Sequence, residues 1–214
     1  MYRLMIKDIY TQRKSAYVAP LLLIAFFITK EKDINSTVLI ENLIFSLSIA
    51  YMAFFMMMTS NFNTRESERM QYRLLLSLPI TRRTVINAKY AMISVWWLIS
   101  YVTYIFIVIL KEIFHLSLNL SFDVNVTLLS FCFAYLLASI FYPIHFKFGY
   151  RVSNLVGIII FFLVASGFGK LMSINTEPTS IVLERPVLTV AILSFVVTLL
   201  SYLISERIFT KRDF

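Results

Sequence analysis

The chain has 214 residues, of which 59% are hydrophobic and only 15% are charged, and its mean hydropathy is +0.77. A soluble domain of this size needs far more charged surface, so the composition excludes a soluble enzyme, a disordered tail and a disulfide-stapled secreted domain. Cys132 is the single cysteine, which also excludes an intrachain disulfide. The sequence therefore predicts an integral membrane protein with a net charge of +8.

Residues 1–14 are predicted to form a short interfacial helix. At helical spacing, one side of this segment carries Tyr2, Met5, Ile6, Ile9 and Tyr10. The other side carries Arg3, Lys7, Asp8, Thr11 and Lys14. This division is typical of an amphipathic helix that lies in the plane of the membrane. A frayed polar N-terminus is the alternative.

Six apolar stretches predict six transmembrane helices, because a helix needs about 20 residues to cross about 30 Å of hydrocarbon. They cover about residues 15–30, 40–62, 90–110, 124–145, 152–170 and 186–205. The first stretch is short, and Lys14 and Lys30 extend it by turning their ammonium groups outward. The expected fold is an all-α membrane protein in which residues 1–214 form a single domain.

The Lys and Arg residues predict the orientation. If the N-terminus, the loops around 61–90 and 146–153 and the C-terminal tail share one side, 15 of the 20 basic residues lie there. Such an asymmetry over short loops marks the cytoplasmic side, so both termini are expected in the cytoplasm. Topology and anionic lipid headgroups then account for the positive charge, and no nucleic-acid partner is expected.

The longest cytoplasmic loop, residues 61–89, has a pattern of its own. Thr64 can cap a helix that carries Glu66 in its first turn, where negative charge is favourable. Pro79 ends this helix, and Thr81 is placed to cap a new helix that runs through Lys89 into the third span. The loop is thus predicted to be a helix, a tight break and a second helix; a solvated basic loop is the alternative.

Several kinds of chemistry are absent from the sequence. It contains no GxxxxGK[ST] loop for ATP, no HExxH or GxSxG motif, and no second ligand at metal-binding spacing from His115 or His145. The predicted spans also lack ionisable residues at mid-depth, which argues against a proton-driven transporter. The pattern favours a non-enzymatic membrane scaffold whose energy source lies on another protein.

One segment carries a family resemblance. Glu66-Ser67-Glu68-Arg69, followed by the turn Ser77-Leu78-Pro79-Ile80-Thr81-Arg82 and a basic helix rising into the third span, resembles the bacterial ABC-2 type exporter permeases. Within them the chain is most similar to the small permeases of exporters of phenol-soluble modulins and related cytotoxic peptides. The resemblance implies an ATP-driven export function for an amphipathic or hydrophobic substrate such as a peptide.

The resemblance also implies partners and site residues. Such permeases pair as homodimers or heterodimers in the bacterial cell membrane and dock a separate ATPase, which holds ATP and magnesium, so this chain needs no cofactor or metal of its own. The helix between the second and third spans is the coupling helix, which here corresponds to Thr64–Ser77, and Pro79 and Thr81 form its joint to the third span. The candidate ATPase contacts are Glu66, Glu68, Arg69, Tyr72 and Arg73.

Two alternatives stay open from sequence alone. A membrane protein that confers immunity to membrane-active peptides, or senses them without transporting them, has the same composition. The methionine-rich second span is either packing or an adaptable apolar surface for the substrate. Its relevant side chains are Met52, Phe54, Phe55, Met56, Met57 and Met58.

Overall fold

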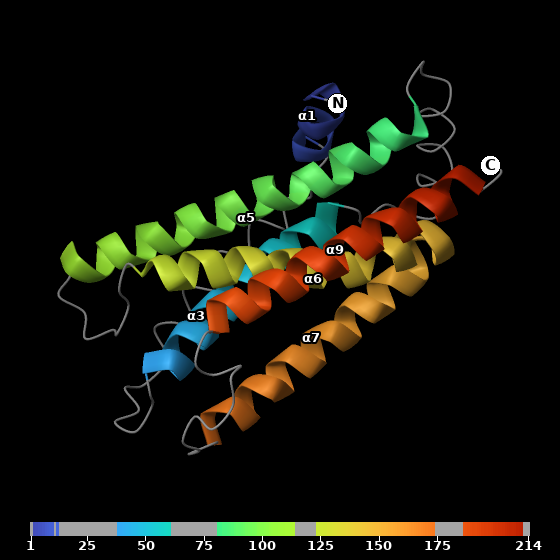
Figure 1. Cartoon of the computed structure of the whole chain (residues 1–214). Helices are drawn as coiled ribbons and strands as arrows, with labels where there is room; N and C mark the ends of the chain where they lie inside the picture. The colour runs from blue at the N-terminus through green and yellow to red at the C-terminus, as the bar shows by residue number, and fades with distance from the viewer. Residues whose placement is uncertain are drawn as a thin grey trace.

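The computed structural model describes residues 2–10, 12, 38–60, 81–113, 123–173 and 186–211. These ranges are helical throughout apart from single residues at helix ends, and they contain no strand. The helices are α1 (Tyr2–Tyr10), α3 (Val38–Ser60), α5 (Arg82–Ile113), α6 (Val124–Phe148), α7 (Tyr150–Ser173) and α9 (Pro186–Lys211) (Figure 1). The predicted all-α class is confirmed for this part of the chain.

Four of the described helices, α3, α5, α6 and α9, are long and apolar enough to cross a membrane. Helix α7 corresponds to the fifth expected span and contributes a shorter apolar stretch, Arg151–Ile160. The expected first span, 15–30, and the expected coupling helix, 64–77, lie outside the described residues. The chain is thus a multi-pass membrane protein.

The helices extend beyond the apolar stretches that predicted them. Helix α5 has 32 residues, which corresponds to about 48 Å at about 1.5 Å per residue and exceeds the hydrocarbon thickness of about 30 Å. Its extra length begins at Arg82, eight residues before the predicted span, and α9 likewise continues to Lys211. Hydropathy marks only the part of a helix that lies in hydrocarbon. The polar start of α5 was expected separately, from the cap at Thr81, whereas the polar end of α9 was not expected.

Helix α6 lies at the centre of the bundle and packs most extensively against α9 and α3 (Figure 1). Its contact with α9 is polar as well as close. The Ser139 hydroxyl lies 3.1 Å from the Thr198 hydroxyl, and the Ser201 hydroxyl donates to the Ser139 carbonyl oxygen across 2.7 Å. Small hydroxyl residues allow membrane helices to approach closely and to hydrogen-bond where water is absent.

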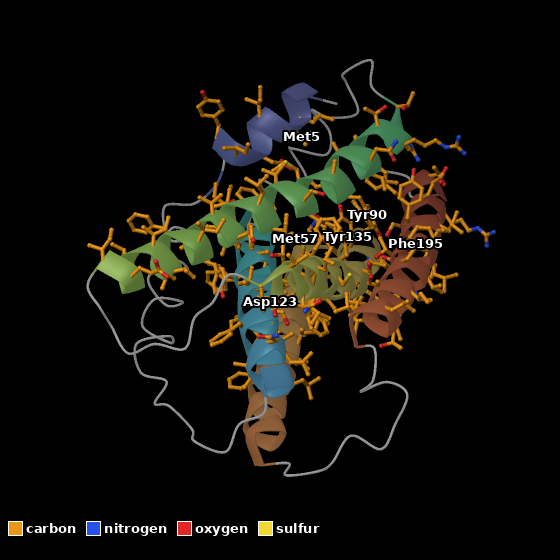
Figure 2. All side chains as sticks on the ribbon, turned by 60° about the vertical axis from the view of Figure 1, so that its left-hand side comes forward. Met5, Met57, Tyr90, Asp123, Tyr135 and Phe195 are labelled. Atoms are coloured by element: carbon orange, nitrogen blue, oxygen red, sulfur yellow. The ribbon has the colours of Figure 1, made fainter. Side chains whose placement is uncertain are left out.

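The methionine-rich face of α3 is packing. Met52, Phe54, Met56 and Met57 are all buried within the bundle (Figure 2). Methionine is suited to this place because its flexible thioether chain fills irregular gaps between helices. The alternative of an adaptable surface open to substrate therefore does not apply to these four side chains.

Helix α1 corrects one detail of the sequence analysis. Spacing placed Asp8 on the polar side of the interfacial helix and Ile9 and Tyr10 on the apolar side. In the structure Asp8 is only 8% exposed and pairs with Lys89 of α5, whereas Ile9 and Tyr10 are exposed, as apolar side chains that face a membrane would be. The helix docks on α5 through Asp8, with Leu4 and Met5 packed against the core, because a basic partner on α5 outweighs the local pattern (Figure 2).

Candidate functional site

The candidate site is the end of the bundle where α5 begins and α9 ends. We name it the α5–α9 joint. It comprises Arg82, Arg83, Asn87 and Tyr90 of α5 with Ser201, Tyr202, Ser205, Glu206, Phe209 and Thr210 of α9. The residues that precede α5 in sequence belong to the predicted coupling segment, so the joint lies where that segment meets the membrane helices.

Thr81 sits directly before the first residue of α5. Its hydroxyl oxygen lies 3.4 Å from the backbone N–H of Thr84, and the two threonine hydroxyls are 2.8 Å apart. This is the geometry of an N-cap, in which a side-chain oxygen satisfies one of the free N–H groups of the first turn. The start of α5 is therefore set locally, by Thr81.

The first residues of α5 hold the last turn of α9. Arg82 Nη1 donates to the carbonyl oxygens of Thr210, at 2.7 Å, and Phe209, at 3.4 Å. Arg83 forms an ion pair with Glu206, whose side chain is 18% exposed. Helix ends leave carbonyl oxygens without intrahelical partners, and a nearby cation also interacts favourably with the helix dipole. The two arginines thus cap the C-terminal end of α9.

Two tyrosines close the joint one to two turns deeper. The buried Tyr90 hydroxyl lies 2.6 Å from the Ser201 hydroxyl and 3.1 Å from that of Ser205 (Figure 2). The Tyr202 hydroxyl donates to Asn87 Oδ1 across 2.6 Å. The Tyr90 and Tyr202 rings meet edge to face, with centroids 5.5 Å apart. Every polar group named here has a partner, as buried groups in a membrane require.

Lys89 connects the joint to α1 and α6. Its ammonium nitrogen lies 2.8 Å from Asp8 Oδ2 of α1, and its backbone carbonyl oxygen accepts a hydrogen bond from the Tyr142 hydroxyl of α6 at 3.0 Å. Side-chain contacts therefore tie the first three turns of α5 to α1, α6 and α9.

A separate set of contacts holds the opposite end of the bundle. Asp123 caps α6 by accepting from the Asn125 N–H at 2.9 Å, and its second carboxylate oxygen accepts from the Asn42 amide of α3 at 2.7 Å. The Tyr101 hydroxyl of α5 lies 2.8 Å from the Thr127 hydroxyl of α6. Side chains thus take part in the contacts that tie both ends of the bundle.

Between the two ends, α5 and α6 are bridged by hydrogen bonds from aromatic side chains. The Trp97 indole N–H donates to the Ser130 hydroxyl at 3.0 Å, and the Ser94 and Tyr135 hydroxyls are 2.6 Å apart. The Trp97 and Tyr101 rings stack, with centroids 5.2 Å apart. These half-buried pairs set the register between α5 and α6.

The arrangement consists of attachments between helices. Within the described ranges, no three His, Cys, Asp or Glu side chains lie close enough to hold a metal ion. The joint combines a helix start that Thr81 caps with side-chain contacts from that start to α1, α6 and α9.

The sequence-predicted site residues are placed unevenly. Thr81 belongs to the described structure, at the helix start. The other predicted residues lie outside the described ranges: Glu66, Glu68, Arg69, Tyr72, Arg73 and Pro79. Sequence reasoning missed the partners of Arg82, Arg83 and Tyr90. It placed the two arginines among the cytoplasmic charges and Arg82 in the family turn, and neither observation pointed to α9. The acidic Glu206 near the C-terminal end of the last span was the one available signal.

Residues 3–210 match the family described as ABC-2 family transporter protein. No curated protein and no solved structure matches the chain significantly. The family match spans nearly the whole chain, in agreement with the resemblance at residues 66–90 and with the membrane-spanning helices. The chain therefore belongs to the ABC-2 transporter family, as a multi-pass permease-type membrane protein.

Proposed function

We propose that the chain is the permease subunit of an ATP-driven ABC exporter and moves an amphipathic or hydrophobic substrate, such as a peptide, out of a bacterial cell. Family membership supports a role in transport. The observation that carries the rest is the α5–α9 joint, a firmly tied helix start directly after the segment that resembles a coupling helix.

The proposed motor is a separate ATPase subunit, because the sequence lacks a phosphate-binding loop. ATP and magnesium would bind on that subunit. The coupling helix Thr64–Ser77 would contact it through Glu66, Glu68, Arg69, Tyr72 and Arg73. Pro79 and Thr81 would then transmit the movement of the coupling helix to α5. The proline break and the capped helix start would leave only a short connection between the two helices.

Force that enters at Thr81 is shared among helices. Arg82 and Arg83 hold the end of α9, and Tyr90 holds the same helix one to two turns deeper. Two helices tied at several points along about two turns move together rather than hinge at one contact. The joint therefore supports coupled movement of α5 and α9 in response to ATP binding and hydrolysis.

The proposed setting is the bacterial plasma membrane, with the α5–α9 joint and both termini in the cytoplasm. The outward faces of α5 and α9 suit a lipid environment or a second permease subunit, in a homodimer or heterodimer. Large apolar side chains are exposed along both helices. They include Leu98, Val102 and Phe106 on α5 and Phe195, Leu199 and Leu203 on α9 (Figure 2).

Co-purification followed by reconstitution tests this proposal. The affinity-tagged permease should bring down an ABC-type ATPase. The purified permease alone should hydrolyse no ATP, and the reconstituted complex should hydrolyse ATP and accumulate an amphipathic peptide in inverted vesicles. An ATPase variant without its P-loop lysine is the matched control and should assemble without transport. Peptide resistance without a co-purifying ATPase would instead indicate an immunity protein and would overturn the proposal.

A further inference from the structure

Asp8 and Lys89 form an ion pair that is largely shielded from solvent. It joins the short helix α1 to α5, with a nitrogen–oxygen distance of 2.8 Å between residues that are 81 positions apart. The Asp8 side chain is 11% exposed and that of Lys89 is 20% exposed. A pair this well shielded from water is sensitive to the loss of either partner, because the remaining charge stays in a poorly solvated place.

Helix α1 depends on such contacts for its position. It has nine residues, whereas an isolated helix shorter than about 12–15 residues is marginal in water. Leu4 and Met5 contribute partly buried apolar contacts. Apolar contacts of this kind are not directional, so they permit α1 to slide or rotate on α5. The ion pair adds a specific point of attachment.

A second polar contact from the same segment reaches α3. The side-chain amide of Gln12 donates to the Met56 carbonyl oxygen at 3.1 Å and to the Thr59 hydroxyl at 3.0 Å. Both acceptors lie near the end of α3, the helix after which the predicted coupling segment begins. The N-terminal segment thus contacts the helices on both sides of that segment in sequence: α3 before it and α5 after it.

Lys89 occupies a special place on α5. It lies eight residues after Thr81, within the turns tied to α9, and its carbonyl oxygen accepts the hydrogen bond from Tyr142 of α6. A movement of the start of α5 therefore passes through a residue that holds α1 by its side chain and α6 by its backbone. The docked helix has to follow such a movement or lose the ion pair.

We infer that Asp8 and Lys89 are positioning residues for transport: their ion pair makes α1 part of the moving joint instead of a helix that merely lies on the membrane surface. The inference rests on the proposed permease function. It adds that this ion pair attaches the N-terminal helix to the coupling pathway, and that membrane insertion does not require the ion pair.

Double electron–electron resonance tests the structural part without any ATPase. Spin labels at Tyr10 of α1 and Val102 of α5, both exposed, report the distance between the two helices in a Cys132→Ser background reconstituted in nanodiscs. The parent should give a narrow distance distribution. Asp8→Lys and Lys89→Asp should each broaden it, and the swapped variant that carries both substitutions should restore it. Lys147→Asp changes an exposed charge elsewhere and should leave the distribution narrow.

Transport by the reconstituted permease–ATPase complex tests the functional part. Each single substitution should lower transported substrate per ATP hydrolysed by about tenfold or more, with unchanged membrane levels, and the swap should recover most of the loss. The conservative variants Asp8→Glu and Lys89→Arg should stay close to the parent. Narrow distributions in both single variants, or a swap as defective as they are, would overturn the inference. Failure of the unsubstituted complex to transport would instead overturn the proposed function, while the distance measurement would still report the attachment of α1.

Discussion

Arg82, the first residue of α5, donates a hydrogen bond across 2.7 Å to the carbonyl oxygen of Thr210, in the last turn of α9 and 128 positions away. A second bond from the same nitrogen reaches Phe209, and Arg83 pairs with Glu206 one turn earlier in α9. The first residue of α5 thus caps carbonyl oxygens at the C-terminal end of α9. This relationship makes the α5–α9 joint a unit that can be tested apart from transport.

Arg82→Ala should loosen the last turn of α9. A net loss of about 1 kcal/mol for a hydrogen bond at a partly exposed site corresponds to a rise of about fivefold in the opening equilibrium. Hydrogen exchange followed by mass spectrometry should therefore show faster exchange in the peptide that covers residues 205–211. Arg207→Ala, which removes an exposed arginine from the same region, is the matched control and should leave that peptide unchanged. Equal exchange in both variants would contradict the capping role.

Tyr90→Phe should lower stability and coupling together. The substitution removes the hydroxyl shared with Ser201 and Ser205, at a cost of about 0.6–1.7 kcal/mol as measured for polar contacts between membrane helices. Tyr135→Phe removes a similar hydroxyl contact, with Ser94, away from the joint. Both variants should unfold at a lower concentration of denaturing detergent than the parent. Only Tyr90→Phe should reduce the amount of substrate transported per ATP hydrolysed. A parallel loss of coupling in Tyr135→Phe would show that the joint has no special role.

Gly157→Val should disturb the contact between α7 and α3. A Cβ atom at Gly157 would overlap Met58 Sδ, so the larger side chain has to push the methionine or the helix aside. Overpacking of this kind costs about 1–3 kcal/mol. Combining it with Met58→Ala should recover most of the thermal stability in detergent, because the shorter side chain vacates the space. A double variant less stable than Gly157→Val alone would refute this packing.

Reversing Glu66 and Glu68 to Lys tests the proposed coupling helix. The change places like charges beside Arg65, Arg69 and Arg73, which weakens a helix by only about 0.2–0.5 kcal/mol per pair and should leave membrane levels normal. Loss of a desolvated charge contact with the motor costs about 2–5 kcal/mol, or about thirtyfold to several thousandfold in affinity. Co-purification with the ATPase should therefore fall sharply. Lys111→Glu should leave assembly intact, and normal assembly of the double reversal would remove the coupling role.

Cysteine accessibility tests the predicted orientation. In a Cys132→Ser background, single cysteines at Asn35, Ser117 or Thr179 should react with an impermeant maleimide added to whole cells. Cysteines at Ser67 or Thr210 should react only after permeabilisation, because the charge asymmetry places them in the cytoplasm. Labelling of Ser67 from outside would reverse the proposed topology and would leave the α5–α9 joint beyond the reach of a cytoplasmic ATPase.

The sequence by itself was sufficient for properties that arise from neighbouring residues. Apolar stretches predicted helices that the structure places at 38–60, 82–113, 124–148, 150–173 and 186–211, and the helix expected after Thr81 begins at Arg82. The segment around residues 66–90 indicated the family that the match over residues 3–210 shows. Hydropathy sums over adjacent residues and a cap acts over three positions, so both can be recognised in a linear pattern.

The tertiary structure alone decided which distant groups meet. Spacing placed Asp8 on the polar side of α1, yet Lys89 draws it into a shielded ion pair. The sequence placed Arg82 among the cytoplasmic charges and in the family turn, and only the structure brings it to the carbonyl oxygens in the last turn of α9. Met52, Met56 and Met57 of α3 were open to two interpretations until packing buried them. A hydrogen bond or ion pair acts over only about 3 Å, so its partner depends on how helices 80 to 130 residues apart come together. A local sequence pattern does not contain that information.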